Sequence, residues 1–171
     1  GKSIPNLLGG TPTAEATGAR IAPMKAKLLT ARGKRVRPAT DDKVLTAWNG
    51  LMISAFARAY DAFGRDEDLR SARRATDFVL AHLTKGDRLL VSFRGGKAHL
   101  NAYLDDYAFL ARGLVDLYES GFDRGDLDRA AGFARTMSSR FGDGHGGFHF
   151  TSDDHEAILT RTRSTYDDAI P

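Results

Sequence analysis

The apolar positions of this chain predict two kinds of helix that alternate along the sequence. Residues 42–63 and 104–120 are apolar nearly all round, which is typical of helices buried on most sides. The stretches that follow them, 67–83 and 125–141, are apolar on one side only and should face solvent with the other. A further helix is predicted over residues 13–31, after a lead rich in Gly and Pro.

Short strand-like segments follow each pair of helices. Residues 89–93 and 97–100 predict a β-hairpin that turns at Gly95-Gly96, and residues 147–159 predict a second one. Helix, helix, hairpin is therefore the expected structural unit.

This unit recurs with a period of about 58 to 59 residues, longer than that of common solenoid repeats. Six positions of the first unit, Leu45, Trp48, Leu51, Tyr60, Leu69 and Ala72, recur as Leu104, Tyr107, Leu110, Tyr118, Leu127 and Ala130. A third unit begins at Asp167, so we expect the sequence to be part of a longer protein.

Buried and half-exposed helices that alternate in consecutive hairpins are typical of an α/α toroid, in which outer helices surround an inner ring. We therefore predict an all-α fold, a partial α/α toroid with short β-hairpins between the helix pairs. Residues 1–171 would form a single partial domain. An open α-solenoid fits less well, because the unit is long and contains hairpins.

Three aspartate pairs, Asp41-Asp42, Asp105-Asp106 and Asp167-Asp168, stand near the starts of inner helices or of the third unit. If inner helices run parallel, these pairs lie at one end of the ring and rim a shared cavity. Two nearby carboxyls can act as acid and as base or nucleophile, as in glycoside cleavage. The alternative is helix capping, which explains one aspartate of each pair. A fourth pair, Asp153-Asp154, is most simply explained by a turn.

The candidate site residues follow from this arrangement. The acids or bases would be Asp42, Asp105, Asp106 and Asp168, and the substrate-binding residues Lys43, Trp48, Asn49, His99 and Tyr107. Trp48 and Tyr107 would offer ring faces to a sugar, or else be core residues at equivalent positions of the repeat.

Composition narrows the classes of protein and of chemistry that remain open. The balance of 42% apolar and 27% charged residues is that of a globular domain, and the absence of Cys excludes disulfides and thiol chemistry in this stretch. There is no candidate membrane span and no signal-peptide pattern, so we expect a cytosolic location. We predict no cofactor and no metal, since the glycines beside His145 and His149 indicate a turn rather than a helix that would align them.

Basic residues gather between Arg20 and Arg37, where no acid occurs. Such a run can hold an anionic partner, or it can be the solvated face of a helix. Because the run has no interleaved aromatics and the net charge is only +3, we predict no nucleic-acid partner.

Four segments carry a resemblance to a known family: 41–53, 104–110, 146–148 and 167–171. They resemble the YyaL-type thioredoxin-domain-containing proteins, which are related to the mammalian spermatogenesis-associated protein. The resemblance implies a thioredoxin-like domain followed by a six-hairpin toroid similar to N-acylglucosamine 2-epimerase and to several glycosidases. This chain would supply the first part of that toroid, with residues 1–12 as the linker after the thioredoxin-like domain.

Two functions stay open. The chain would be part of a carbohydrate-processing enzyme, an isomerase, epimerase or hydrolase acting on a small carbohydrate. Alternatively, it would be a non-catalytic binding or scaffold domain attached to a thioredoxin-like redox module. In either case its partners would be the remainder of the toroid and the thioredoxin-like domain, and in isolation we expect the chain to self-associate through uncovered inner helices.

Overall fold

The computed structural model describes residues 14–156 and 159–163, with side chains described from residue 21 onward. The chain divides into two compact units, Gly1–Asp41 and Asp42–Pro171, which we call unit 1 and unit 2. The predicted linker 1–12 and the aspartates Asp167 and Asp168 lie outside the described residues.

Unit 1 consists of helix α1 (Ala14–Gly33) and an extended segment that leads to Asp41. The helix agrees closely with the predicted range. Its described apolar side chains are largely exposed, including Met24, Leu28 and Leu29, so α1 contributes little to a core of its own.

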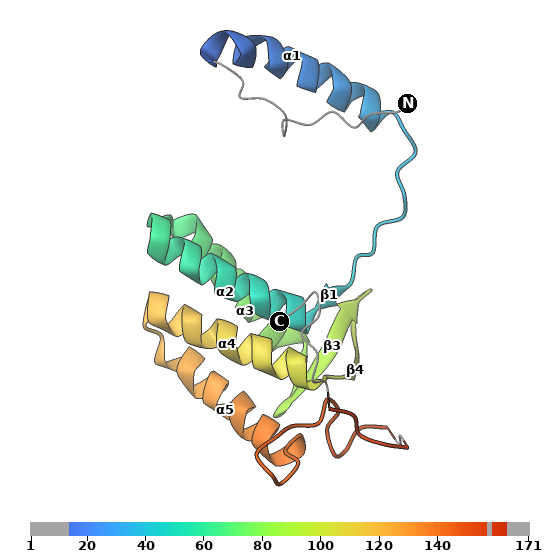
Figure 1. Ribbon diagram of the computed structural model, residues 1–171, viewed down its shortest axis with the longest axis vertical. Coiled ribbons are helices and arrows are strands. Elements are labelled where there is room, and N and C mark those ends of the chain that lie inside the picture. The colour runs from blue at the N-terminus through green and yellow to red at the C-terminus, as the bar shows by residue number, and fades with distance from the viewer. Residues whose placement is uncertain (1–13, 157–158, 164–171) are drawn as a thin grey trace. The chain divides into compact units, whose positions relative to one another are not determined.

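Unit 2 contains two helix hairpins, shown in Figure 1. The first is formed by α2 (Thr46–Phe63) and α3 (Asp66–His82), and the second by α4 (Leu104–Gly121) and α5 (Arg124–Arg140). Each hairpin turns at a residue in the left-handed conformation, Gly64 with φ 66° and Phe122 with φ 55°. Helices α2 and α4 lie side by side as the inner layer, and α3 and α5 pack against them. The predicted α/α architecture is confirmed.

The two inner helices approach closely because glycines face each other at their contact. A Cβ atom on Gly50 would lie 2.6 Å from the backbone nitrogen of Leu110, and one on Gly113 would lie 2.6 Å from the carbonyl oxygen of Gly50. Nearer the helix ends, the Ser120 hydroxyl donates to the carbonyl oxygen of Ala57 at 3.3 Å. These contacts follow the same order on both helices, so α2 and α4 run parallel.

Burial differs between the two inner helices. Nine residues of α4 are buried, including Tyr107, Leu110 and Leu114, but only four of α2. The difference arises because α4 lies between α2 and α5, whereas α2 contacts an inner helix on one side only. Trp48 and Met52 of α2 are consequently 59% and 48% exposed.

A small antiparallel sheet stands beside the helix starts. Strand β3 (Arg88–Arg94) pairs with β1 (Val44–Leu45), β2 (Thr84–Lys85) and β4 (Lys97–Asn101). The hairpin of β3 and β4 turns at Gly95 and Gly96, as predicted.

Two details of the predicted elements are wrong. The helix expected from residue 42 begins only at Thr46, because Val44 and Leu45 pair with β3 as a strand. Over the described part of the second predicted hairpin, the structure has an isolated bridge between Gly142 and Phe148 and no strand. There the Asp143 carboxylate accepts the backbone N–H groups of His145 and Gly147, which closes a loop in place of a strand ladder.

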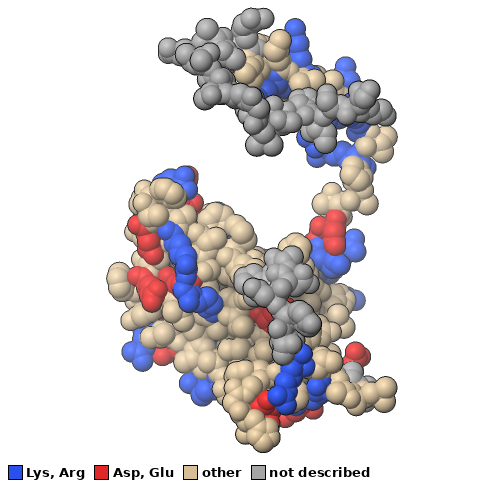
Figure 2. Space-filling view, viewed as in Figure 1, with Lys and Arg blue, Asp and Glu red and all other residues tan. Residues whose placement is uncertain are grey.

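Basic and acidic side chains intermingle on the face of unit 2 shown in Figure 2, with no large patch of one sign. Among residues 14–156 and 159–163, none of the helices combines the length and apolarity that a bilayer crossing requires.

Candidate functional site

Asp106 joins the starts of the two inner helices. Its Oδ1 atom accepts the backbone N–H of Ala47 in the first turn of α2 at 2.9 Å, and its Oδ2 atom accepts that of Tyr103, the N-cap of α4, at 2.9 Å. N–H groups at a helix start have no partner within the helix, so one carboxyl serves both helices. The Asp106 side chain is only 3% exposed.

The environment of Asp106 disfavours its charge. Burial raises the pKa of this carboxyl to about 7, and the neighbouring Asp105 adds to the rise, against the lowering effect of the two N–H groups. Because both oxygens accept hydrogen bonds from the backbone, Asp106 fixes the geometry of the helix starts rather than facing a ligand.

Asp105 lies beside it in a different environment. This residue is half-buried, and burial raises the pKa of its carboxyl despite hydrogen bonds from backbone N–H groups. Its Oδ1 atom accepts the N–H of Asp106 at 3.0 Å, and the carboxyl also accepts its own backbone N–H, so its partners belong to the start of its own helix. Asp105 is therefore the carboxyl of the pair that can meet a ligand.

Asp42 does not start a helix, contrary to the prediction. Because β1 precedes α2, Asp42 lies before the strand, where it is exposed and forms an ion pair with Arg94 of β3 at 2.5 Å. Lys43 is exposed in the same segment. Asp168 lies outside the described residues, so Asp105 and Asp106 are the candidate acids that the structure brings to one end of the inner helices.

Trp48 and Asn49 lie in the first turn of α2. The Trp48 ring is 59% exposed, so it is not a core residue. The Asn49 amide is half-buried and donates to the carbonyl oxygen of Leu45 at 2.7 Å, which fixes the turn from β1 into α2. Of these two side chains, Trp48 is the one exposed to solvent, so it is available to contact a ligand.

Tyr107 belongs to the core, as the alternative interpretation of the repeat held. It is fully buried, and its ring packs at steep angles against Phe133 and Phe141. Its hydroxyl accepts the backbone N–H of Leu89 at 2.9 Å, which ties α4 to β3. The ring therefore has no free face for a sugar, and the predicted substrate-binding role is wrong.

His99 is exposed on β4, opposite Ser92 of β3. The other described histidines do not form a metal site either. Among the described residues, no group of three or more His, Asp or Glu side chains is close enough to hold an ion.

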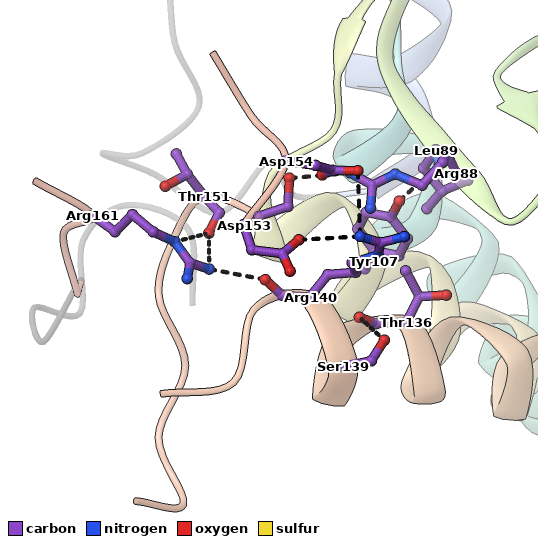
Figure 3. Close-up of polar contacts among 11 residues, drawn as sticks. Arg88, Leu89, Tyr107, Thr136, Ser139, Arg140, Thr151, Asp153, Asp154 and Arg161 are labelled. Carbon is purple, nitrogen blue, oxygen red and sulfur yellow. Dashed lines mark hydrogen bonds and ion pairs between the residues drawn. The ribbon is translucent and has the colours of Figure 1, made fainter. Parts of the chain in front are cut away.

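A polar network that the sequence did not indicate lies next to Tyr107 (Figure 3). The Arg88 guanidinium donates to the Ser152 hydroxyl at 3.0 Å and to Asp154 at 2.7 Å, and Arg140 pairs with Asp153 at 3.4 Å. The aspartates 153 and 154 are thus ion-paired as well as part of a turn. Their partners are too distant in sequence for any spacing to predict them.

A second unpredicted cluster joins the inner helices further along. The buried carboxylate of Asp116 on α4 accepts hydrogen bonds from Ser54 and Arg58 of α2 and from Arg112 of its own helix. Burial opposes its charge, but these three donors outweigh that effect and hold the pKa of Asp116 below its usual value. The cluster adds a polar contact between α2 and α4 away from the candidate site.

One hollow on the surface of unit 2 lies away from the candidate residues. It has a volume of about 390 Å³ and lies between the end of α3, the β2–β3 turn and α5, with Leu80, Asp87, Arg129 and Phe133 in its lining. None of the candidate residues lines it. The predicted cavity shared by the aspartate pairs is therefore not this hollow.

The parallel inner helices and their outer partners define the chain as part of an α/α toroid. Solved structures with this fold include a sugar epimerase from a ruminal bacterium, with a TM-score of 0.55 and 17% identity over 58% of this chain and 26% of that one. Cellobiose 2-epimerase from Bacillus thermoamylovorans B4167 has a TM-score of 0.59 and 13% identity over 64% of this chain and 32% of that one. At these identities the similarity establishes the fold.

Sequence relatives identify a more specific similarity. The chain is 35% identical over 137 residues to human Spermatogenesis-associated protein 20, which covers 74% of this chain and 17% of the relative. It is 32% identical over 169 residues to the rat protein of the same name, and this match covers 86% of this chain and 21% of the rat protein. The chain thus spans about a fifth of the length of these relatives. No family model matches it.

Proposed function

We propose that the chain is part of a toroid domain that binds and processes carbohydrates, with its sugar-facing end at the starts of α2 and α4. The observation that carries this proposal is the contrast within the aspartate pair at the start of α4. Asp106 is held by N–H groups of two inner-helix starts, whereas Asp105 is half-buried, has a raised pKa and accepts hydrogen bonds from N–H groups at the start of its own helix. The similarity to the sugar epimerases in fold supports the substrate class.

The roles follow from these environments. A carboxyl whose pKa is raised above its ordinary value is better suited to give a proton to a sugar oxygen or to remove one from the carbon next to a carbonyl. Asp105 would be this acid or base, and the exposed ring of Trp48 would pack against the apolar face of the sugar. Epimerase-like chemistry fits better than glycoside hydrolysis, which needs a second available carboxyl across the bond.

A second candidate is a non-catalytic carbohydrate-binding or scaffold domain. The structural role of Asp106 and the ion pair of Asp42 favour it, because both carboxylates have structural partners. In this version the chain belongs to a YyaL-type protein, and the toroid presents a ligand to a thioredoxin-like module elsewhere in the longer polypeptide.

Binding can be tested on the chain itself, because Trp48 is its only tryptophan. Titration with reducing mono- and disaccharides should change the fluorescence emission of Trp48. If Asp105 contacts the bound sugar, as we propose, Asp105→Asn should lose this change. An emission that no sugar alters would contradict the proposed binding site.

Catalysis requires the longer protein that carries this segment. In D₂O, an epimerase exchanges the proton at the carbon next to the sugar carbonyl, which ¹H NMR detects as signal loss and as a new epimer. Asp105→Asn should abolish the exchange, while the matched control Asp128→Asn, an exposed residue of α5, should leave it unchanged. Sugar binding without exchange in the wild type would establish the non-catalytic candidate instead.

A further inference from the structure

The link made by Asp106 joins two helices through a single titratable group. One oxygen binds the N–H of Ala47 next to Trp48, and the other binds the N–H of Tyr103 before Asp105. Trp48 directly follows one of the backbone groups that this carboxyl holds, and Asp105 lies two residues after the other. Their relative position depends on both hydrogen bonds being intact.

Ionisation determines whether one carboxyl can keep two such bonds. An ionised carboxylate accepts at both oxygens, whereas a protonated one has a hydroxyl that is a donor and a poor acceptor. Charge-assisted N–H bonds are also stronger than neutral ones. Protonation thus weakens one of the two bonds and leaves a buried N–H group less well satisfied.

The charged groups near Asp106 leave the pKa of its carboxyl close to neutral pH. Asp105, from its own helix, is the charged group that acts on it among the described residues, and it opposes a second negative charge. Helix α2 and the segment before α4 present the N–H groups of Ala47 and Tyr103 rather than a cation. Burial and this repulsion together bring the pKa of Asp106 to about 7.

We propose that Asp106 is a pH-responsive link that holds the starts of α2 and α4 together when ionised and loosens one of them when protonated. The regulation of a sugar site by this link rests on the proposed function, but the link itself does not. In its ionised form the link would fix Trp48 and Asp105 at a constant separation. Sugar binding would then strengthen as the pH rises through the transition.

NMR of the sugar-free chain tests the link directly. The ¹H–¹⁵N signals of Ala47 and Tyr103 should shift between about pH 5 and about pH 9 with one common midpoint near pH 7. The amide of Leu89 is a matched control, since burial raises the pKa of its acceptor Tyr107 above the ordinary value of about 10 and this amide should not shift. Static Ala47 and Tyr103 signals, or signals with two different midpoints, would overturn the proposal.

The variant Asp106→Asn provides a second test through the emission of Trp48. The wild type should show a transition near pH 7, and Asp106→Asn should show none, while Asp105→Asn should retain it at a lower midpoint because a repelling charge is gone. A transition that persists unchanged in Asp106→Asn would assign it to another group. Because no sugar is present, these outcomes are independent of whether the site binds one.

Discussion

The close approach of α2 and α4 gives the fold its sharpest test, the substitution Gly50→Ala. The added Cβ atom would lie 2.6 Å from the backbone nitrogen of Leu110 and 2.6 Å from the carbonyl carbon of Phe109. Both atoms belong to the backbone of α4, so no side chain can turn aside to make room. The inner helices would have to separate.

The size of the effect follows from the overlap. Ordinary contact begins at 3.4 Å, so the helices must move apart by about 0.8 Å at this point. Overpacking of this kind costs about 1 to 3 kcal/mol, and separation also stretches the 2.9 Å bond between Asp106 and Ala47. Replacing a helical glycine by alanine returns about 1 kcal/mol. We therefore expect a net loss of up to about 2 kcal/mol.

Urea unfolding followed by far-UV circular dichroism measures this loss. Gly132→Ala in α5 is the matched control, because the added Cβ atom would lie 3.9 Å from the flexible guanidinium of Arg135. That variant should be neutral or more stable by up to about 1 kcal/mol. If the two variants had equal unfolding free energies, the close packing of α2 against α4 described above would be contradicted.

Three further predictions concern the candidate site and its surroundings. The folded-state pKa of Asp106 lies above its unfolded value, so its contribution to stability is full below about pH 4 and is lost as the pH rises to about 7. From about pH 5 to about pH 8, the unfolding free energy of the wild type should fall by about 2 to 3 kcal/mol relative to that of Asp106→Asn in urea titrations, and a difference that stays constant would contradict this. Tyr107→Phe should cost about 1 kcal/mol in the same assay, since the buried N–H of Leu89 loses its acceptor, and an unchanged midpoint would show that the bond is not made. Trp48→Ala should change stability by less than about 1 kcal/mol but reduce self-association in analytical ultracentrifugation, because the exposed ring adds apolar contact area. Equal self-association of the wild type and Trp48→Ala would exclude the surface around Trp48 as the contact.

The helices could be predicted from sequence because their apolar patterns are local. Residues 104–120 are apolar all round and form the buried α4, while the one-sided pattern of residues 67–83 gives the amphipathic α3. Strand β1 could not be predicted, because Val44 and Leu45 continue the apolar pattern of α2 and form a strand only through pairing with Phe93 and Ser92. That pairing is a tertiary contact.

Repeat symmetry was a poorer guide to the site. Trp48 and Tyr107 occupy equivalent positions, yet Trp48 is exposed and Tyr107 is fully buried. The reason is the number of helices around each: α4 has neighbours on both sides, and α2 has an inner neighbour on one side. Side-chain type and spacing predict the helix, whereas its neighbours determine whether a ring is a core residue or a surface for a ligand.

The same reasoning explains why one aspartate pair divides its roles and the other does not. Successive residues on a helix point about 100° apart, so when Asp106 faces the start of α2, Asp105 must face elsewhere. This separation requires both residues to be helical, as they are at the start of α4. Asp42 lies before β1 and pairs with Arg94 instead, so its sequence similarity to the second pair carries no similarity of role. A carboxyl doublet thus becomes one structural link and one candidate acid only where a helix begins at it.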